Sequence, residues 1–278
     1  MSVEAPSGKH AGTENFPVGS ILIRADLRPH VHAYYRFART ADDIADSPDL
    51  APEEKVRRLD LMGAALIGES TADVEVSRGM RASLAQTGVS PTTCLDLLVA
   101  FRWDATRLRY RDWDDLMEYC RYSANPVGRY LLELHGETAE THGPSDALCS
   151  ALQVINHLQD LADDYRALDR VYLPQDAMAL GGIDVTALAA PASAPGLRLA
   201  IDRTLDRTAA LLVEARRLPG LVRDRRLRWE CAAIVALAHR LTAMLRVQDP
   251  LARRVKLGKL GALVTALGGV LGVYGRAA

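Results

Sequence analysis

Apolar residues recur at spacings of three and four along almost the whole sequence, and this periodicity is the feature that most restricts the possible folds. It predicts amphipathic helices, whereas no alternation of apolar and polar residues is sustained long enough for a strand. The breaks are short and carry helix-start and turn residues, as in "SPDLAPEE" at 47–54. We therefore expect an all-α, single-domain helical bundle. The expected helices lie near 27–46, 52–68, 74–87, 91–108, 113–123, 126–136, 145–166, 196–217, 221–246 and 256–274.

The composition agrees with a helical fold and narrows the classes of function. The 278 residues are rich in Ala, Leu and Arg, and unbranched side chains of this kind lose little freedom in a helix. A hydrophobic content of 49% is ample for a core. The net charge of -1 gives no reason to expect a nucleic-acid partner. The four cysteines are far apart and form no C-x-x-C pair, which indicates a reducing, cytoplasmic compartment.

The two ends of the chain have different characters. The polar start, "MSVEAPSGKHAGTE", lacks the apolar core of a signal peptide, and residues 1–13 are expected to be a flexible segment before a domain at 14–278. No apolar run reaches the roughly 18 residues of a transmembrane helix. The apolar stretch "LGALVTALGGVLGVY" at 260–274 follows four basic residues. It is either a helix docked on the core or a peripheral contact with the inner face of a membrane. Oligomeric state is not predicted.

An acidic cluster stands out in the first expected helix, where residues 39–46 are "RTADDIAD". Residues four apart lie on one face of a helix, so Asp42 and Asp46 project together, with Asp43 beside them. Like charges at this spacing destabilise an isolated helix by roughly a few tenths of a kcal/mol. The cluster is either a solvated helix face or one half of a cation site, and these eight residues alone do not decide between the two.

The same spacing returns at 153–164, where the sequence is "QVINHLQDLADD". Asp160 and Asp164 repeat the interval of four, and Gln153 and Asn156 extend a polar stripe back along an otherwise apolar helix. Polar groups on a buried face are costly unless they meet a partner. This stripe could face the first acidic cluster across a helical bundle, and the carboxylates would then form a shared oxygen site.

Such a site fits Mg²⁺, because hard oxygen ligands favour Mg²⁺ over zinc or copper. Mg²⁺ commonly shares phosphate oxygens with its substrate, and Arg39, Arg170 and Tyr172 could reach the same ligand. Carboxylates, Mg²⁺ and arginines are together the parts of a diphosphate clamp. A di-iron bundle would need Glu-x-x-His, which the sequence lacks. His157 is interpreted as a packed histidine rather than a metal ligand, and no dinucleotide-binding motif is present.

These motifs resemble those of the squalene and phytoene synthase family. The family pattern Phe-x-Arg-x-x-Asp-Asp-x-x-Asp matches residues 37–46, and Gln-x-x-Asn-x-x-x-Asp-x-x-x-Asp matches 153–164. The pattern Arg-x-Tyr-x-Pro matches 170–174. Between them, "YCRYSANPVGR" resembles the central substrate-lining helix of the family, with Tyr119 at the matching place. The resemblance covers roughly residues 14–260.

The resemblance implies an isoprenoid-synthase fold with a central apolar cavity, and an isoprenoid diphosphate as substrate. The stretches "ENFPV" and "NHLQDLADDYRALDRVYLP" are most similar to members that ionise presqualene diphosphate and let water capture the rearranged cation as hydroxysqualene. Mg²⁺, expected as three ions that arrive with the diphosphate, would be held by Asp42, Asp43, Asp46, Asp160 and Asp164. Substrate contacts are implied for Arg39, Gln153, Asn156, Arg170 and Tyr172.

The sequence departs from the family pattern at three places. Asp169 replaces a common glycine, and the gap before Arg170 is one residue longer. Asn15, within "TENFP", stands where condensing members carry serines. We interpret Asn15 as a diphosphate contact, and the lack of those serines as evidence against condensation. At Asn125–Pro126, either Pro126 simply breaks the helix or Asn125 places a polar group that positions the capturing water.

Two other functions stay open. One is head-to-head condensation of two prenyl diphosphates to presqualene diphosphate or phytoene. The other is a non-catalytic assembly factor, which is disfavoured because Asp42, Asp46, Asp160 and Asp164 are all present.

Overall fold

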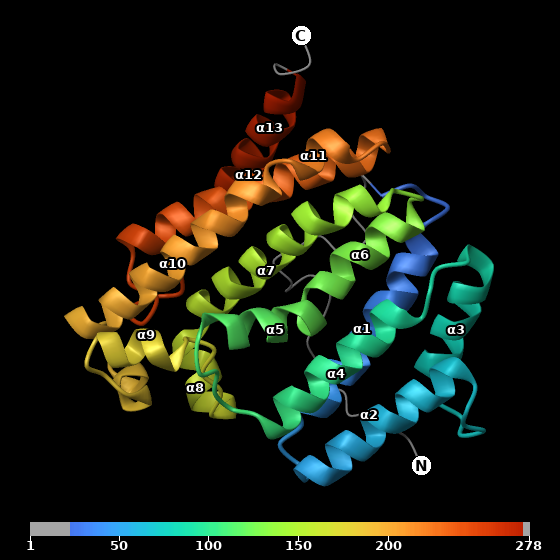
Figure 1. Ribbon diagram of the computed structural model, residues 1–278, viewed down its shortest axis with the longest axis horizontal. Helices are drawn as coiled ribbons and strands as arrows, with labels where there is room; N and C mark the ends of the chain where they lie inside the picture. The colour runs from blue at the N-terminus through green and yellow to red at the C-terminus, as the bar shows by residue number, and fades with distance from the viewer. Residues whose placement is uncertain (1–22, 275–278) are drawn as a thin grey trace. The chain divides into compact units, whose positions relative to one another are not determined.

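The computed structural model describes residues 23–274, and side chains as far as Gly272. The expected all-α fold is confirmed, because the part of the chain that is described contains helices and no strand (Figure 1). The chain forms two compact units. The described residues of the first unit are 23–107 and 126–138, and those of the second are 108–125 and 139–274.

The first unit is built around α1 (Arg28–Asp46), which contacts α2 (Pro52–Ile67), α3 (Glu75–Thr87) and α4 (Thr92–Thr106). The helix α6 (Asn125–Leu134) adds its residues from Pro126 onward. Its Tyr130 ring stacks on Tyr34 of α1 with centroids 4.0 Å apart, and the Tyr130 hydroxyl donates to the His30 carbonyl at 3.1 Å. The core is apolar and includes Phe37, Ile44, Leu59, Met62, Met80 and Leu98, each fully buried.

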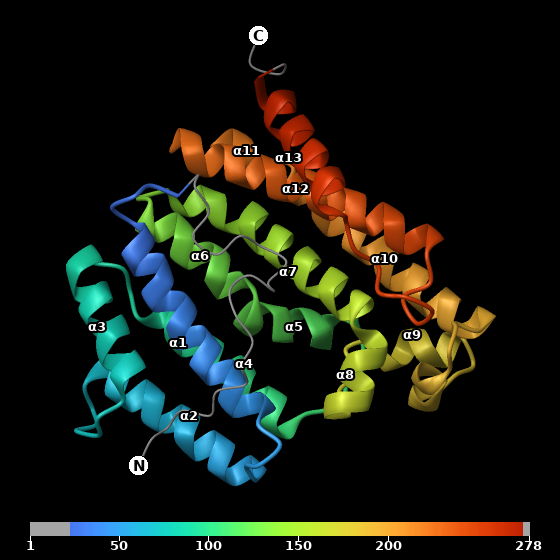
Figure 2. The ribbon, with the colours of Figure 1, turned by 180° about the vertical axis from the view of Figure 1, so that it is seen from behind.

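The second unit contains the remaining helices. They are α5 (Trp113–Ser123), η2 (Ala139–Thr141), α7 (His142–Gln159), α8 (Leu161–Leu168), α9 (Gln175–Leu180), η3 (Val185–Ala189), α10 (Pro195–Ala215), α11 (Leu218–Leu221), α12 (Arg225–Val247) and α13 (Lys259–Tyr274). The helix α7 packs against α5, α10 and α12, and α13 packs against α12. Figure 2 shows this group from behind.

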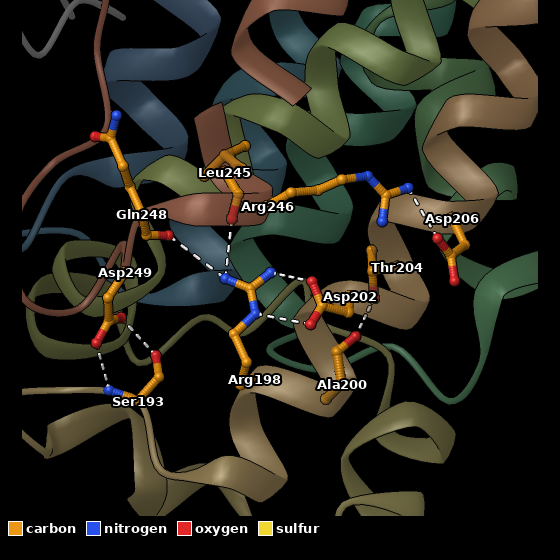
Figure 3. A network of polar contacts seen from close by, with 10 residues as sticks. All are labelled: Ser193, Arg198, Ala200, Asp202, Thr204, Asp206, Leu245, Arg246, Gln248 and Asp249. Carbon is orange, nitrogen blue, oxygen red and sulfur yellow. Dashed lines mark hydrogen bonds and ion pairs between the residues drawn. The ribbon is translucent and has the colours of Figure 1, made fainter. Parts of the chain in front are cut away.

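A polar network ties the start of α10 to the end of α12 (Figure 3). Arg198 pairs with Asp202 one turn along α10 and donates to the Leu245 carbonyl at 2.9 Å. Asp249, just after α12, accepts from the hydroxyl and the backbone N–H of Ser193 at 2.6 and 2.7 Å. The last carbonyls of a helix have no partner within it, so the Arg198 bond satisfies a group that would otherwise need water. These contacts fix the long α10–α12 pair that supports α7.

Most expected helices are present with ends shifted by a few residues, but one prediction was wrong. The segment 145–166 is not a single helix, because Asp160 leaves helical geometry at φ -106° and ψ 13° and separates α7 from α8. The amide of Asp160 still donates to Asn156 O, and Asp164 N donates to Asp160 O at 2.8 Å. These two hydrogen bonds span the turn at Asp160. The short elements α9, η3 and α11 were not predicted.

Candidate active site

The first acidic cluster lies on one face of α1, as predicted. The opposite face buries Phe37, Ala41 and Ile44, so the helix is held in one orientation within the first unit. On the outer face, residues 39, 42, 43 and 46 are half-buried rather than fully solvated. A carboxylate in this position has lost part of its hydration and needs a positive partner.

Arg39 supplies positive charge to this face. Its Nη1 lies 2.8 Å from Asp42 Oδ2 and its Nη2 lies 2.5 Å from Asp43 Oδ1. The Arg39 side chain is only 15% exposed and that of Asp43 only 12%, so these pairs are screened less than surface ion pairs. The arginine links two of the carboxylates on this face to each other.

The second acidic stripe lies at the junction of α7 and α8, within the second unit. Gln153, Asn156 and Asp160 are half-buried on the polar side of α7, while Leu158 and Ile155 are buried on the other side. Figure 2 shows α8 continuing at an angle from the end of α7. The stripe is present, but the turn at Asp160 separates the residues of α7 from Asp164 on α8.

Asp160 has a charged partner that its sequence neighbourhood does not indicate. Arg254, between α12 and α13, places Nε 2.9 Å from Asp160 Oδ1 and donates from Nη2 to Oδ2 at 3.0 Å. Burial raises the pKa of the Asp160 carboxyl, the Arg254 guanidinium opposes that rise, and the nearby charges of Asp164 and Asp163 add to it. Asp160 is therefore a carboxylate whose ionised form gains from additional positive charge.

His157 connects the α7 stripe to the loop after α8. Its ring stacks on Tyr172 with centroids 3.4 Å apart and planes 11° apart, so the interpretation as a packed histidine is confirmed. The Gln153 amide nitrogen lies 3.1 Å from His157 Nε2. If that amide donates, Nε2 accepts and the ring proton is on Nδ1. His157 Nδ1 lies 3.7 Å from Asp164 Oδ2, which is beyond hydrogen-bond distance.

An aromatic cluster surrounds Tyr172. The rings of Tyr110 and Tyr119 each have centroids 5.4 Å from that of Tyr172, and all three tyrosines are buried. An isolated bridge between Arg109 and Val171 holds the two segments together, with Val171 N donating to Leu108 O at 2.9 Å. The predicted residues Tyr119 and Tyr172 are thus brought together, and Tyr110 is a member that the sequence patterns did not indicate.

Asp169 occupies a backbone position that favours glycine. Its φ is +50° and its ψ is 31°, the left-handed region, and it ends α8. Asp and Asn tolerate this region better than most residues. Arg109 Nη2 donates to Asp169 Oδ1 at 2.6 Å and so holds the side chain. The substitution of the family's glycine is therefore accommodated locally. Arg170, directly after it, is buried.

The expected helix break is present, but it lies at Ala124 rather than at Pro126, because α5 ends at Ser123 and α6 begins at Asn125. Asn125 is buried, and its Oδ1 accepts from the Ser150 hydroxyl on α7 at 2.9 Å. Pro126 is the second residue of α6, where a missing N–H is tolerated. The structure assigns the Asn125 carbonyl a partner, and its role toward water stays a prediction.

The remaining expectations have different outcomes. Asn15 and residues 1–13 lie outside the described residues. Within residues 23–274, no three His, Cys, Asp or Glu side chains are grouped closely enough to hold a metal. The oxygen-only donors of each motif, with Asp160 partly buried, still fit Mg²⁺ chemically. The shared Mg²⁺ site and the central cavity stay predictions. No helix among the described residues is long and apolar enough to cross a membrane.

The fold and these motifs define an all-α protein in which carboxylates and arginines occupy helix faces in both units. A family model described as squalene/phytoene synthase matches residues 9–261, and the chain belongs to this family. It is 45% identical over 265 residues to the hydroxysqualene synthase of Rhodopseudomonas palustris, covering 95% of this chain and 90% of that protein. It is 43% identical to the hydroxysqualene synthase of Sinorhizobium fredii, covering 92% and 87%.

Solved structures of similar proteins have the same fold. The crystal structure of squalene synthase HpnC from Alicyclobacillus acidocaldarius has a TM-score of 0.74 at 33% identity, and covers 85% of this chain and 89% of that one. A dehydrosqualene synthase structure has a TM-score of 0.73, covers 90% and 87%, and at 23% identity supports the fold alone.

Proposed function

We propose that this chain is a hydroxysqualene synthase that converts presqualene diphosphate to hydroxysqualene and diphosphate. The observation that carries the proposal is its 45% and 43% identity, over more than nine tenths of the chain, to two proteins of that name. The complete acidic motifs on α1 and at the α7–α8 junction support it, because catalysis needs them and a purely structural homologue does not.

The proposed chemistry starts with loss of diphosphate. The carbon–oxygen bond breaks, diphosphate leaves with the electron pair, and the cyclopropylcarbinyl cation rearranges before water adds and gives up a proton. This makes the enzyme a carbon–oxygen lyase acting on a diphosphate. Bound Mg²⁺ would neutralise the charge that develops on the leaving group. The residues proposed to hold it are Asp42, Asp43, Asp46, Asp160 and Asp164.

The other polar residues act on the anion directly. Arg39 and Arg170 are proposed to bind diphosphate oxygens, since a guanidinium matches phosphate geometry with two parallel hydrogen bonds. The aromatic cluster around Tyr172 is proposed to stabilise the cation electrostatically through its rings. An apolar surrounding would restrict water to the position where capture is productive.

The competing activity is condensation of two prenyl diphosphates. Its support is 30% identity to the phytoene synthase of Mycobacterium tuberculosis, over 88% of this chain. The identity is lower than for the two hydroxysqualene synthases, so we rank condensation second.

A substrate-choice assay tests the proposal. Purified protein with Mg²⁺ receives presqualene diphosphate in one reaction and farnesyl diphosphate in another, and both the organic product and released diphosphate are measured. We expect turnover of presqualene diphosphate to hydroxysqualene and none of farnesyl diphosphate alone. Turnover of farnesyl diphosphate alone would contradict the proposal and favour condensation.

A further inference from the structure

The helix α13 carries its large aliphatic side chains on the side that faces solvent. Five of them, each between 53% and 75% exposed, are Leu260, Leu263, Val264, Leu267 and Leu271. Intervals of three, four, seven and eleven residues put them on one face of the helix. A helix that docks on a protein core normally turns this row inward, so the exposed row needs an apolar partner.

The opposite face of α13 packs on α12. A Cβ added at Gly269 would lie 2.6 Å from the Ala232 carbonyl oxygen and 2.7 Å from the Ala236 Cβ, so α13 packs closely on α12 through small residues. The two helices make the most extensive helix–helix contact of the second unit. In both Figure 1 and Figure 2, α13 lies against α12 and extends past it. This segment is therefore docked on the core through α12, which was one of its two expected arrangements, and the leucine row stays exposed.

The charged side chains in the segment that carries the row all have one sign. No acidic residue occurs after Asp249 in the whole sequence. Arg253, Lys256 and Lys259 are exposed beside the start of α13, while Arg254 is paired with Asp160. An apolar face with a basic flank is complementary to a lipid bilayer that carries anionic headgroups.

We propose that this face of α13 docks in the plane of an anionic lipid bilayer. With 16 residues the helix is about 24 Å long, shorter than the roughly 30 Å hydrocarbon thickness, so it lies in the interface rather than across it. The leucine row would enter the acyl region and the basic flank would meet the headgroups. The apolar substrate and product of the proposed function would partition into the same bilayer, and only this last point rests on that function.

Vesicle co-sedimentation of the full chain tests the proposal. One set of vesicles contains phosphatidylcholine alone, and the other contains equal parts of phosphatidylcholine and phosphatidylglycerol. We expect binding to the anionic vesicles that weakens with salt, and much less binding to the neutral ones. The Leu263→Glu, Leu267→Glu double variant should lower the partition coefficient at least about tenfold. The Lys256→Gln, Lys259→Gln double variant should lower it on the order of tenfold, on anionic vesicles only.

The matched control is the Leu199→Glu, Val213→Glu double variant, which places the same two charges at aliphatic residues of α10 that are 52% and 65% exposed and should leave binding unchanged. Circular dichroism and turnover of detergent-dispersed presqualene diphosphate are measured for every variant. Retained turnover with lost vesicle binding supports the docking surface, whereas absent turnover in the parent chain contradicts the proposed function alone. The docking proposal is overturned if the parent chain does not bind anionic vesicles, or if the leucine variant binds as well as the parent. It is also overturned if that variant only converts a dimer to a monomer, because a second copy then covers the row.

Discussion

Arginines provide counter-charge to the acidic motifs in each unit of the protein. Arg39 pairs with Asp42 and Asp43 on its own helix, and Arg254 pairs with Asp160 across 94 positions of sequence. Breaking a partly buried pair by removing one partner leaves an uncompensated charge, so these aspartates depend on positive charge in their native surroundings. A cation that arrives with an anionic substrate would add to, or replace, that charge.

Two substitutions distinguish a structural role of Asn125 from a role in positioning the capturing water. Asn125→Ala removes both its amide and the acceptor of the Ser150 hydroxyl, whereas Ser150→Ala removes only the hydroxyl. Each change should lower the free energy of unfolding by about 1 kcal/mol. We expect only Asn125→Ala to reduce the share of alcohol among the products, measured by gas chromatography. An unchanged alcohol share in Asn125→Ala would mean that the residue serves the helix junction alone.

Substitutions at Asp169 measure how much its left-handed backbone conformation lowers the stability of the fold. Asp169→Gly removes the ion pair with Arg109 but relieves the strained φ, while Asp169→Ala removes the pair and keeps the strain. The alanine variant should therefore be less stable than the glycine variant by about 1 kcal/mol. Urea denaturation measures the difference. Equal stabilities would show that the backbone at this position relaxes freely.

At the scale of elements, the sequence predicts helices well where an apolar stripe is long. The helix α1 and the pair α10 and α12 follow from their periodicity, because burying a stripe dictates both the helix and its orientation. The turn at Asp160 was not predicted, since the apolar pattern continues through it and the ion-pair partner of Asp160, Arg254, is distant in sequence. The helices α9 and α11 span only six and four residues, too few for a periodic pattern.

The link between α10 and α12 gives a pH-dependent contribution to stability. Partial burial raises the pKa of the Asp249 carboxyl, but hydrogen bonds from Ser193 and the Leu251 amide outweigh burial and hold the pKa below its usual range. A lowered carboxyl pKa stabilises the fold above the usual aspartate value, about 3.9, and that contribution is lost as the pH falls through the lower native value.

Asp249→Asn should therefore reduce the free energy of unfolding by about 1–2 kcal/mol at neutral pH, with a difference from the parent that narrows as the pH falls below the usual aspartate pKa. Urea denaturation across this range measures it. A difference that is constant with pH would show that Asp249 acts through packing rather than through its charge.

For the whole molecule, the sequence predicted which residues share a helix face at the site, but it did not predict which residues from other segments contact them. The spacing of four predicted which aspartates share a helix face, because helix geometry is local. The ion pair of Arg254 and the stacking of His157 on Tyr172 join residues distant in sequence, and no local pattern encodes them. The exposure of the leucine row on α13 likewise depends on which side of the helix meets α12.

Binding of Mg²⁺ with inorganic diphosphate should stabilise the protein if both acidic motifs hold the same ligand. A ligand at a hundred times its dissociation constant adds about 2.7 kcal/mol to the free energy of unfolding. We expect a higher melting temperature with the two ligands together than with either alone. Asp42→Asn, in the first unit, and Asp160→Asn, in the second, should each abolish the shift and leave the fold intact by circular dichroism. A shift that persists in either variant would show that its motif does not take part.

The proposed function requires that this chain ionises presqualene diphosphate and that water captures the cation. The most direct test is the mass spectrum of the product formed from presqualene diphosphate and Mg²⁺ in oxygen-labelled water. We predict hydroxysqualene that carries one labelled oxygen, and its loss by more than about a hundredfold in Asp42→Asn. An unlabelled alcohol, or a hydrocarbon without oxygen as the main product, would contradict the proposed function.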